Sequence, residues 1–297
     1  MIIRTPFEFW AIMNCKEKWS APGDTAMTWL DRTVIAITSR LPDNWLGLRL
    51  AILLRRVVTT RLSADSGLDI ERWGLHMRLH PRDNGCEKGL LFTPQMFEVR
   101  ERVELEAEIK KITAAGRPFV FIDIGANVGL FSLFVASCAG RNAAILAFEP
   151  KPENIRRLRF NIDANPGLPI RVFPFALAER EGSVLLELDR RDRGGTRTLR
   201  ANDGVVHADT FSAQCRPLLS VLMQERVQSI DALKIDVEGV EDTILAPFFR
   251  DAPKSLWPRL LIIEDTSNLW QVDLLSELSA IGYSVAARTK LNFLLRR

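Results

Sequence analysis

One short segment of the sequence, residues 123–129, most restricts what this chain can fold into. An apolar run over 119–122 ends in the carboxylate of Asp123, and Gly125 and Gly129 bracket the residues that follow. The next residues are mostly apolar and contain no proline, so the pattern predicts a buried strand, a tight loop and a helix starting near Gly129. Glycine lets the backbone approach a ligand closely, and a helix N-terminus presents free N–H groups and partial positive charge. The segment therefore predicts a binding site for a charged small molecule.

The spacing of the glycines favours one class of cofactor. A dinucleotide fold uses G-x-G-x-x-G to bring a pyrophosphate against the helix N-terminus, whereas here Gly125 and Gly129 stand alone and Asp123 would repel a pyrophosphate. A carboxylate suits a ligand with a positive amino group, such as S-adenosylmethionine. About twenty residues later a second apolar strand, predicted over 143–148, leads into Glu149, which is placed to accept hydrogen bonds from both ribose hydroxyls. Glu149 suits NAD equally, so a nicotinamide oxidoreductase stays open at this point.

Four motifs in a fixed order carry a resemblance to a known family. They are residues 123–129, then 148–154 with Leu158, Asn161 and Asn165, then 175–178 with Glu181 and Gly182, and finally 233–239. Together they resemble the FkbM family of S-adenosylmethionine-dependent methyltransferases over about residues 94–264. The resemblance implies an α/β, Rossmann-like class I methyltransferase fold, with a mostly parallel seven-stranded sheet and helices on both faces. It also implies which residues bind the cofactor, namely Asp123, Gly125, Ala126, Asn127, Gly129, Glu149, Pro150, Phe175 and Ala176.

The pattern of the chain after Glu149 independently predicts a parallel sheet with helices on both faces, because strands and helices alternate. Strands are predicted over 170–174, 231–236 and 260–264, helices over 152–164, 241–249 and 272–280, and a closing hairpin over 283–287 and 292–295. The cofactor core then spans about 117–265. Ligands of such sheets bind beyond the carboxyl ends of the strands. Four acids fall at these ends: Asp123, Glu149, Asp236 and Glu264.

Asp236 and the nearby Glu238 suggest how the methyl acceptor is activated. Methyl transfer is a direct displacement that depends on alignment of the acceptor, and a hydroxyl acceptor needs a base to take its proton. Asp236 and Glu238 stand where such a base would lie, so both are predicted to be catalytic. They share one side if the strand continues that far. The alternative is that one of them caps the helix that begins near Gly239.

The requirement for a metal stays open. Paired carboxylates could bind a divalent cation that lowers the pKa of the hydroxyl, and Glu264 or Asp265 could join such a site, with at most one of the two facing inward. The sequence assigns no metal ligand. His207 is another candidate base, but its polar surroundings favour an exposed loop residue.

The acceptor is a hydroxyl of a glycan, lipid-linked saccharide or glycosylated metabolite according to the resemblance, which places Gly194, Gly195 and Thr196 beside its pocket. As a hypothesis, Arg193 or Arg197 contacts an acidic sugar; a solvated charged loop is the alternative. Three other readings remain. These are another small-molecule hydroxyl as acceptor, a binding module that recruits partners through residues 1–70, and base methylation, for which the Pro-Pro-aromatic motif is missing. The family's Leu-Asp pair is here Leu219 and Ser220, which weakens transfer of the substrate class.

The first seventy residues are predicted to form a helical extension, and 71–297 the methyltransferase domain. Apolar positions between 24 and 62 predict two amphipathic helices separated at Pro42. Short strands and turns are predicted over 71–94, and a helix over 97–115. The two helices would pack on the domain or on a second copy. The most apolar stretch, 45–58, is too short to span a bilayer, but its arginines allow peripheral membrane contact.

Composition adds weaker expectations about partners and compartment. A net charge of +3 is too small to argue for nucleic acid. The four cysteines are scattered without metal-ligand spacing, as is typical of reduced thiols in the cytosol. No secretory signal pattern is visible. We therefore expect a cytoplasmic protein that acts on a small molecule or glycan.

Overall fold

The computed structural model describes residues 27–63, 66–188, 196–198 and 210–297. The chain divides into two compact units, one of Met1–Phe97 with Phe160–Pro166 and one of Glu98–Arg159 with Gly167–Arg297. From the sequence, the boundary between the helical extension and the methyltransferase domain was predicted at residue 70 instead. The difference arises because a hairpin of β1 (Leu68–Arg72) and β2 (Leu75–Leu79) belongs to the first unit.

The two N-terminal helices form as predicted, as α2 (Trp29–Thr38) and α3 (Trp45–Thr59). A capping box between Thr28 and Asp31 starts α2, and Asn44 starts α3 by accepting a hydrogen bond from the Gly47 N–H at 2.9 Å. Gly47 also keeps the turn between them close, since a Cβ there would lie 2.1 Å from the carbonyl oxygen of Pro42. The sequence pattern and the cap residues therefore agree.

The hairpin strand β2 has an edge that is closed by side chains rather than by another strand. Asn161 Oδ1 accepts from the Arg78 N–H at 2.7 Å, and Asn165 Oδ1 accepts from the His76 N–H at 2.9 Å. Asn165 Nδ2 also donates to the His76 carbonyl at 2.7 Å. These two asparagines of the family-like motif therefore satisfy strand backbone groups.

Helix α4 (Gly85–Phe92) replaces part of the region predicted as strands and turns, so that prediction was wrong there. Its two glycines lower its intrinsic helix propensity. Tertiary contacts override this: Asn84 accepts from the Glu87 N–H at 3.1 Å, and the buried Glu87 carboxylate accepts from the His80 N–H at 2.9 Å. Such contacts are not visible in a local pattern.

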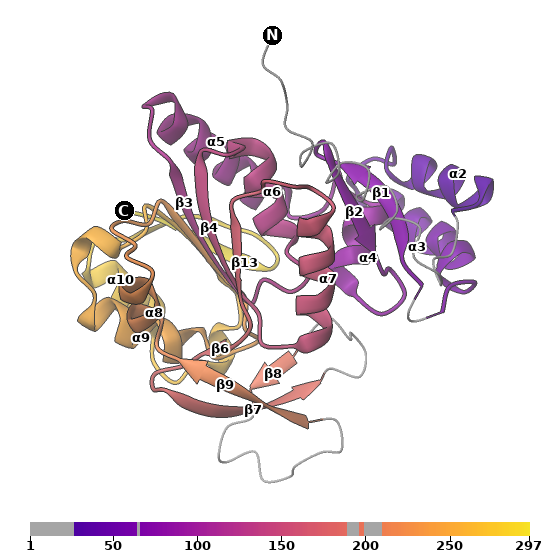
Figure 1. Cartoon of the computed structure of the whole chain (residues 1–297). Helices are drawn as coiled ribbons and strands as arrows, with labels where there is room; N and C mark the ends of the chain where they lie inside the picture. The colour runs from indigo at the N-terminus through magenta and orange to yellow at the C-terminus, as the bar shows by residue number, and fades with distance from the viewer. Residues whose placement is uncertain (1–26, 64–65, 189–195, 199–209) are drawn as a thin grey trace, which may run out of the picture. The chain divides into compact units, whose positions relative to one another are not determined.

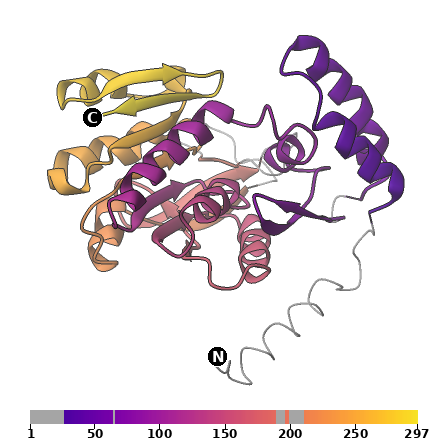
Figure 2. The same ribbon diagram turned by 90° about the horizontal axis from the view of Figure 1, so that it is seen from above.

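The second unit contains the predicted seven-stranded sheet, in the order β12-β13-β11-β10-β3-β4-β5. Its strands are β3 (Phe119–Ile124), β4 (Ala143–Phe148), β5 (Ile170–Phe173), β10 (Ala232–Ile235), β11 (Leu260–Glu264), β12 (Ser284–Arg288) and β13 (Asn292–Arg296). The five strands from β11 to β5 are parallel, while β13 is antiparallel to both β11 and β12. Figure 2 shows this closing hairpin in yellow. The strand order reverses between β3 and β10, which is where ligands bind in such sheets.

Helices cover both faces of this sheet, as predicted (Figure 1). On one face, α8 (Leu218–Gln224), α9 (Glu241–Asp251) and α10 (Leu274–Ala280) pack on Ile124, Ile235 and Ile263 in a single apolar core. On the other face, α5 (Val99–Ala114) and α6 (Leu130–Ala139) contact β3. Helix α7 (Pro152–Asp163) follows β4.

A second, four-stranded sheet has the order β6-β9-β7-β8. Its strands are β6 (Ala176–Leu177), β7 (Gly182–Leu188), β8 (Thr196–Thr198) and β9 (Thr210–Arg216). The sequence pattern predicted an extended segment over 184–188, which lies within β7. It did not predict β9, which pairs with the distant strands β6 and β7. Arg193, Gly194, Gly195 and His207 lie outside the described residues, and the side chains of Thr196 and Arg197 are not described either. Within the described ranges, no helix is both long enough and apolar enough to cross a bilayer.

Candidate functional site

The loop after β3 is tied to the ends of two neighbouring strands. The N–H groups of Gly125 and Ala126 donate to the Phe148 carbonyl at 3.0 and 2.9 Å. Gly125 has φ +75°, and a Cβ there would lie 1.8 Å from the Asp236 carbonyl oxygen. Only glycine fits this position, which brings the loop directly against the end of β10.

Asp123 is buried at the end of β3 and connects the strand to α6. Its Oδ2 accepts from the Ser132 N–H at 3.1 Å and from the Ser132 hydroxyl at 2.6 Å. It thereby satisfies an N–H group at the N-terminus of α6, which begins after Gly129. Burial raises the pKa of Asp123, and the nearby Lys234 ammonium opposes this. Both contacts go to Oδ2, so Ser132 leaves Oδ1 to other donors.

Glu149 is buried just after β4 and holds the same loop. Its Oε2 accepts from the Asn127 N–H at 2.8 Å, and its Oε1 accepts from the Lys151 N–H at 2.9 Å. Burial raises the pKa of Glu149 to about 7, although these hydrogen bonds favour the charged form. Glu149 and Asn127, which were both predicted to bind the cofactor, therefore lie next to each other.

The other residues predicted to bind the cofactor lie after β4 and β5. The Phe175 ring packs edge-on against Phe148 and Phe173, with centroids 6.0 and 5.9 Å apart. Ala176 begins β6 and is buried, and Pro150 is half-buried. An aromatic ring is thus present near the strand ends that carry the acids.

Lys234 is a buried residue of β10 that was not predicted to belong to the site. It pairs with Asp123 across the two central strands, and its Nζ lies 2.7 Å from Asp236 Oδ2 and 4.8 Å from the centre of the Phe131 ring. Burial alone would lower the pKa of Lys234, but the carboxylates of Asp236, Glu98 and Asp123 raise it. The Lys-Ile-Asp spacing was a usable signal, because residues two apart share one side of a strand.

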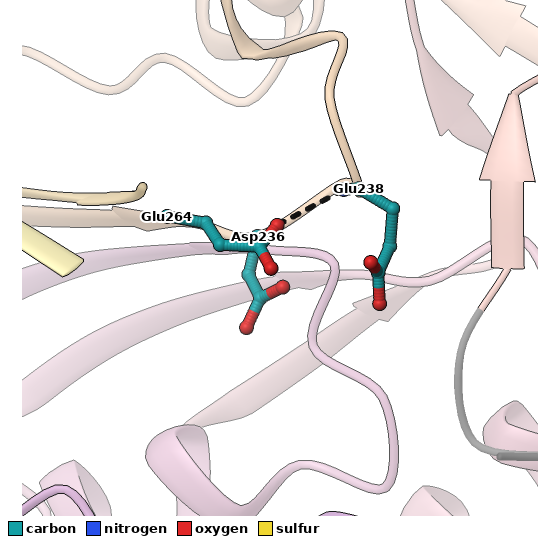
Figure 3. Close-up of side chains that lie close together, drawn as sticks. All are labelled: Asp236, Glu238 and Glu264. Carbon is teal, nitrogen blue, oxygen red and sulfur yellow. Dashed lines mark hydrogen bonds between the residues drawn. The ribbon is translucent and has the colours of Figure 1, made fainter. Parts of the chain in front are cut away.

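Asp236, Glu238 and Glu264 meet at the carboxyl edge of the sheet, with one carboxylate oxygen from each lying within 4.8 Å of the others (Figure 3). The proposed continuation of the strand was wrong, because β10 ends at Ile235. Instead the chain turns at Glu238, with φ +58°, and the Glu238 N–H donates to Glu264 Oε2 at 3.2 Å. Asp236 and Glu238 still extend to the same side. Neither is the N-cap residue of α9, which is Val240.

Glu241, which was also not predicted, stabilises this turn through hydrogen bonds to its backbone. Its carboxylate is fully buried, and Oε1 accepts from the N–H groups of Val237 and Gly239 at 3.1 and 3.2 Å. Oε2 accepts from the Thr266 hydroxyl at 2.6 Å and from Trp270 Nε1 at 2.8 Å. The turn that carries Glu238 is therefore held by a complete set of charge-assisted hydrogen bonds.

The site also changes the protonation of Glu264. Burial, followed by the negative charges of Asp236, Glu238 and Glu241, raises the pKa of Glu264 to about 9. Glu264 therefore keeps its proton at neutral pH. The same crowding of oxygens could hold a divalent cation. Asp265 forms an ion pair with Arg288 at 2.6 Å, so only one of the adjacent acids joins the cluster, as predicted.

We expect Glu264→Gln to stabilise the protein in a pH-dependent way. The unfolded chain releases the Glu264 proton near 4.5, whereas the folded protein keeps it to about 9, so wild-type stability falls as pH rises through this window. Glutamine removes that loss, and the variant should be more stable by roughly 1–3 kcal/mol at about pH 8 and equal near pH 4. Denaturant titrations at several pH values measure this. A constant difference between the two proteins would contradict it.

Lys234→Met is expected to destabilise the fold by about 3–5 kcal/mol, because a buried ion pair loses its cation and leaves carboxylates uncompensated. The double variant Lys234→Met with Asp236→Asn removes one of those charges and should recover part of the loss. Urea unfolding of both variants measures the two values. Equal destabilisation of the single and double variants would show that the pair with Asp236 is not what Lys234 stabilises.

One surface hollow of the second unit lies away from these residues. It measures about 570 Å³ and is lined by residues at the starts of β3, β4 and β5, among them Val120, Ala144 and Ile170. The acids lie at the opposite ends of these strands, so this hollow is not the site described above.

A comparison with known protein families identifies the family of the chain. Residues 123–285 match the methyltransferase FkbM domain, and this span is more than half of the chain. The chain belongs to the FkbM methyltransferase family. The matched residues contain the glycine loop, the Asp236–Glu238 turn and Glu264, so the fold is the class I methyltransferase fold that the sequence predicted.

Individual relatives of this FkbM-family chain are distant. The methyltransferase sdnD of Sordaria araneosa is 30% identical over a match that covers 43% of this chain and 59% of sdnD. The hexuronic acid methyltransferase AglP of Haloferax volcanii is 27% identical over 42% of this chain and 48% of AglP. The chain thus spans less than two thirds of either relative. The crystal structure of methyltransferase FkbM from Methylobacillus flagellatus KT is 15% identical, with a TM-score of 0.39, and the match covers 82% of this chain and 59% of that one.

Proposed function

We propose that this chain is an S-adenosylmethionine-dependent O-methyltransferase. The observation that carries the proposal is the meeting of Asp123, Glu149 and Asp236 around one glycine loop at the strand reversal. The donor set suits the cofactor: the Asp123 carboxylate matches its ammonium group, and Glu149 can accept from its ribose hydroxyls. When bound, the cofactor supplies an activated methyl group on its sulfonium. The other residues proposed to hold it are Gly125, Ala126, Asn127, Gly129, Pro150, Phe175 and Ala176.

Glu238 is the proposed base among the three clustered acids. Glu264 is protonated at neutral pH and cannot accept a proton there. Asp236 is ion-paired with Lys234 at 2.7 Å, so a proton on Oδ2 would disrupt a buried pair. Glu238 is exposed on an ordered turn, where a substrate can reach it. Asp236 is then proposed to orient the acceptor.

The chain's part in the reaction follows from these assignments. Asp236, fixed by Lys234, accepts a hydrogen bond from the acceptor and aligns it. The Glu238 carboxylate would take the hydroxyl proton as the methyl carbon leaves the sulfonium sulfur and bonds to the acceptor oxygen, with S-adenosylhomocysteine as the other product. Glu264, which carries a proton, lies beside both and avoids a third negative charge in the cluster.

A sugar hydroxyl is the proposed acceptor. Support comes from the family and from AglP, a relative named as a hexuronic acid methyltransferase. Arg193 and Arg197 are proposed to contact an acidic sugar, and a double alanine variant tests this. An unchanged Michaelis constant for the acceptor would remove the arginines from the proposal.

A labelled-methyl assay tests the function. The full chain, the cofactor and a panel of uronic, phosphorylated and neutral saccharides are incubated with and without a chelator. Transfer to a saccharide oxygen supports the proposal. Tight cofactor binding without transfer to any hydroxyl would favour a binding module instead. Loss of transfer with the chelator, restored by Mg²⁺, would assign the acid cluster to a cation rather than to a free base.

A further inference from the structure

Helix α3 exposes four of its five leucines and buries mainly small residues. Gly47, Ala51 and Val58 are buried. Four of the exposed apolar residues are spaced four, three and four apart, so they share one helix face, while Leu48 is exposed on another face. We call them the α3 apolar stripe, and their exposed fractions are Leu46 67%, Leu50 41%, Leu53 60% and Val57 43%. A core-packing helix would show the reverse arrangement.

One tryptophan and two arginines of α3 lie beside this stripe, and a second exposed tryptophan begins α2. Trp29 and Trp45, the first residues of α2 and α3, are both largely exposed, and the Arg49 guanidinium lies 5.5 Å from the centre of the Trp45 ring. Arg49 and Arg56 each follow a stripe leucine by three residues, which makes them its neighbours on the helix surface. Tryptophan and arginine beside an apolar face are typical of helices that lie in a membrane interface.

Positive charge is concentrated on the same helix pair. Residues 27–63 contain six arginines and two aspartates, while the whole chain has a net charge of only +3. Asp31 is buried and paired with Arg61 at 2.6 Å, so it adds little negative charge to the surface. The exposed surface is therefore basic as well as apolar.

Contacts and hydrogen bonds hold α2 and α3 together. Helices α2 and α3 lie side by side in both views (Figure 1, Figure 2). The Asp31–Arg61 ion pair joins them, and Gln95 Nε2 donates to the carbonyls of Thr38 and Leu41 at 2.9 Å each, which fixes the turn between them. The stripe is thus presented without a need for further folding.

We propose that α2 and α3 form a docking surface for an anionic lipid bilayer. The α3 apolar stripe enters the interface between headgroups and acyl chains, and the surrounding arginines meet the lipid phosphates. A second copy of the chain fits less well, because a symmetric contact through this stripe would bring arginine against arginine. An anionic bilayer supplies both an apolar layer and negative charge.

Vesicle sedimentation with the full chain tests the proposal. The protein should bind vesicles of equal parts phosphatidylcholine and phosphatidylglycerol, bind phosphatidylcholine vesicles at least about tenfold less, and dissociate at roughly 1 M salt. Leu46→Ser with Leu53→Ser should lower binding by at least about tenfold. Arg49→Gln with Arg56→Gln should lower it similarly.

Matched controls separate this from general surface effects. Met223→Ser changes an equally exposed apolar residue in α8, and Arg156→Gln an exposed arginine in α7. Neither should change vesicle binding, and all variants should keep wild-type thermal unfolding. The proposal is overturned if the wild type ignores anionic vesicles, or if the control variants weaken binding as much as the stripe variants. It is also overturned if sedimentation velocity shows a wild-type dimer that the stripe variants dissolve without any dependence on lipid.

Discussion

Glu238→Gln is expected to lower methyl transfer by about 10²- to 10⁴-fold, because glutamine cannot take the acceptor proton. Affinity for S-adenosylhomocysteine should stay within about threefold of wild type, since the Glu238 side chain is exposed and Glu241 holds the turn independently of it. Single-turnover kinetics and calorimetry measure the two values. Glu106→Gln, which changes a half-exposed acid on α5, is the control and should leave both unchanged.

Asp236→Asn tests whether Asp236 orients the acceptor, as proposed, or acts as the base itself. It should raise the Michaelis constant for the acceptor as well as lower turnover, and it should also destabilise the fold through Lys234. The assignment of the base would be wrong if Glu238→Gln kept full turnover while Asp236→Asn lost it. The turn at Glu238 would then be structural.

Asp123→Asn is expected to weaken S-adenosylhomocysteine binding by at least about a hundredfold, the loss of a charge-assisted hydrogen bond in a buried site. Asparagine is nearly the same size and can still accept from Ser132, so helix α6 should keep its position. Ser132→Ala tests for an effect on the fold, because it removes the hydroxyl contact to Asp123 Oδ2 but leaves the carboxylate charge.

The two variants should therefore differ. Ser132→Ala should lower affinity by only a few fold, while Asp123→Asn nearly abolishes binding in the usual concentration range. Calorimetric titration of both variants, with thermal unfolding to confirm the fold, gives the comparison. Equal loss of affinity in the two would mean that Asp123 acts by holding α6 rather than by meeting the ligand's amine.

Much of the fold was predictable because the central strands are buried on both faces. The run that forms β4 is apolar from end to end and is bounded by polar residues, so its limits of Ala143 and Phe148 were read correctly. Helix α4 and strand β9 were not predicted. The first depends on Asn84 and Glu87 contacts, and the second on pairing with β6 and β7.

The candidate site was predictable where it lies at strand ends. Asp123, Glu149, Asp236 and Glu264 follow or end parallel strands, and these ends meet at one edge of a sheet. The buried position of Glu241 was not predictable in the same way, and for Lys234 only its spacing from Asp236 was a signal. Charged residues are seldom fully buried without partners, and the partners here, such as Phe131 and Trp270, are distant in the sequence.

Calorimetric titration of the wild-type chain with S-adenosylhomocysteine, and separately with NAD, tests the central claim most directly. The carboxylate of Asp123 at the glycine loop predicts saturable binding of S-adenosylhomocysteine and none of NAD, since a pyrophosphate would meet a buried negative charge. Binding of NAD with no binding of S-adenosylhomocysteine would contradict the proposed cofactor site.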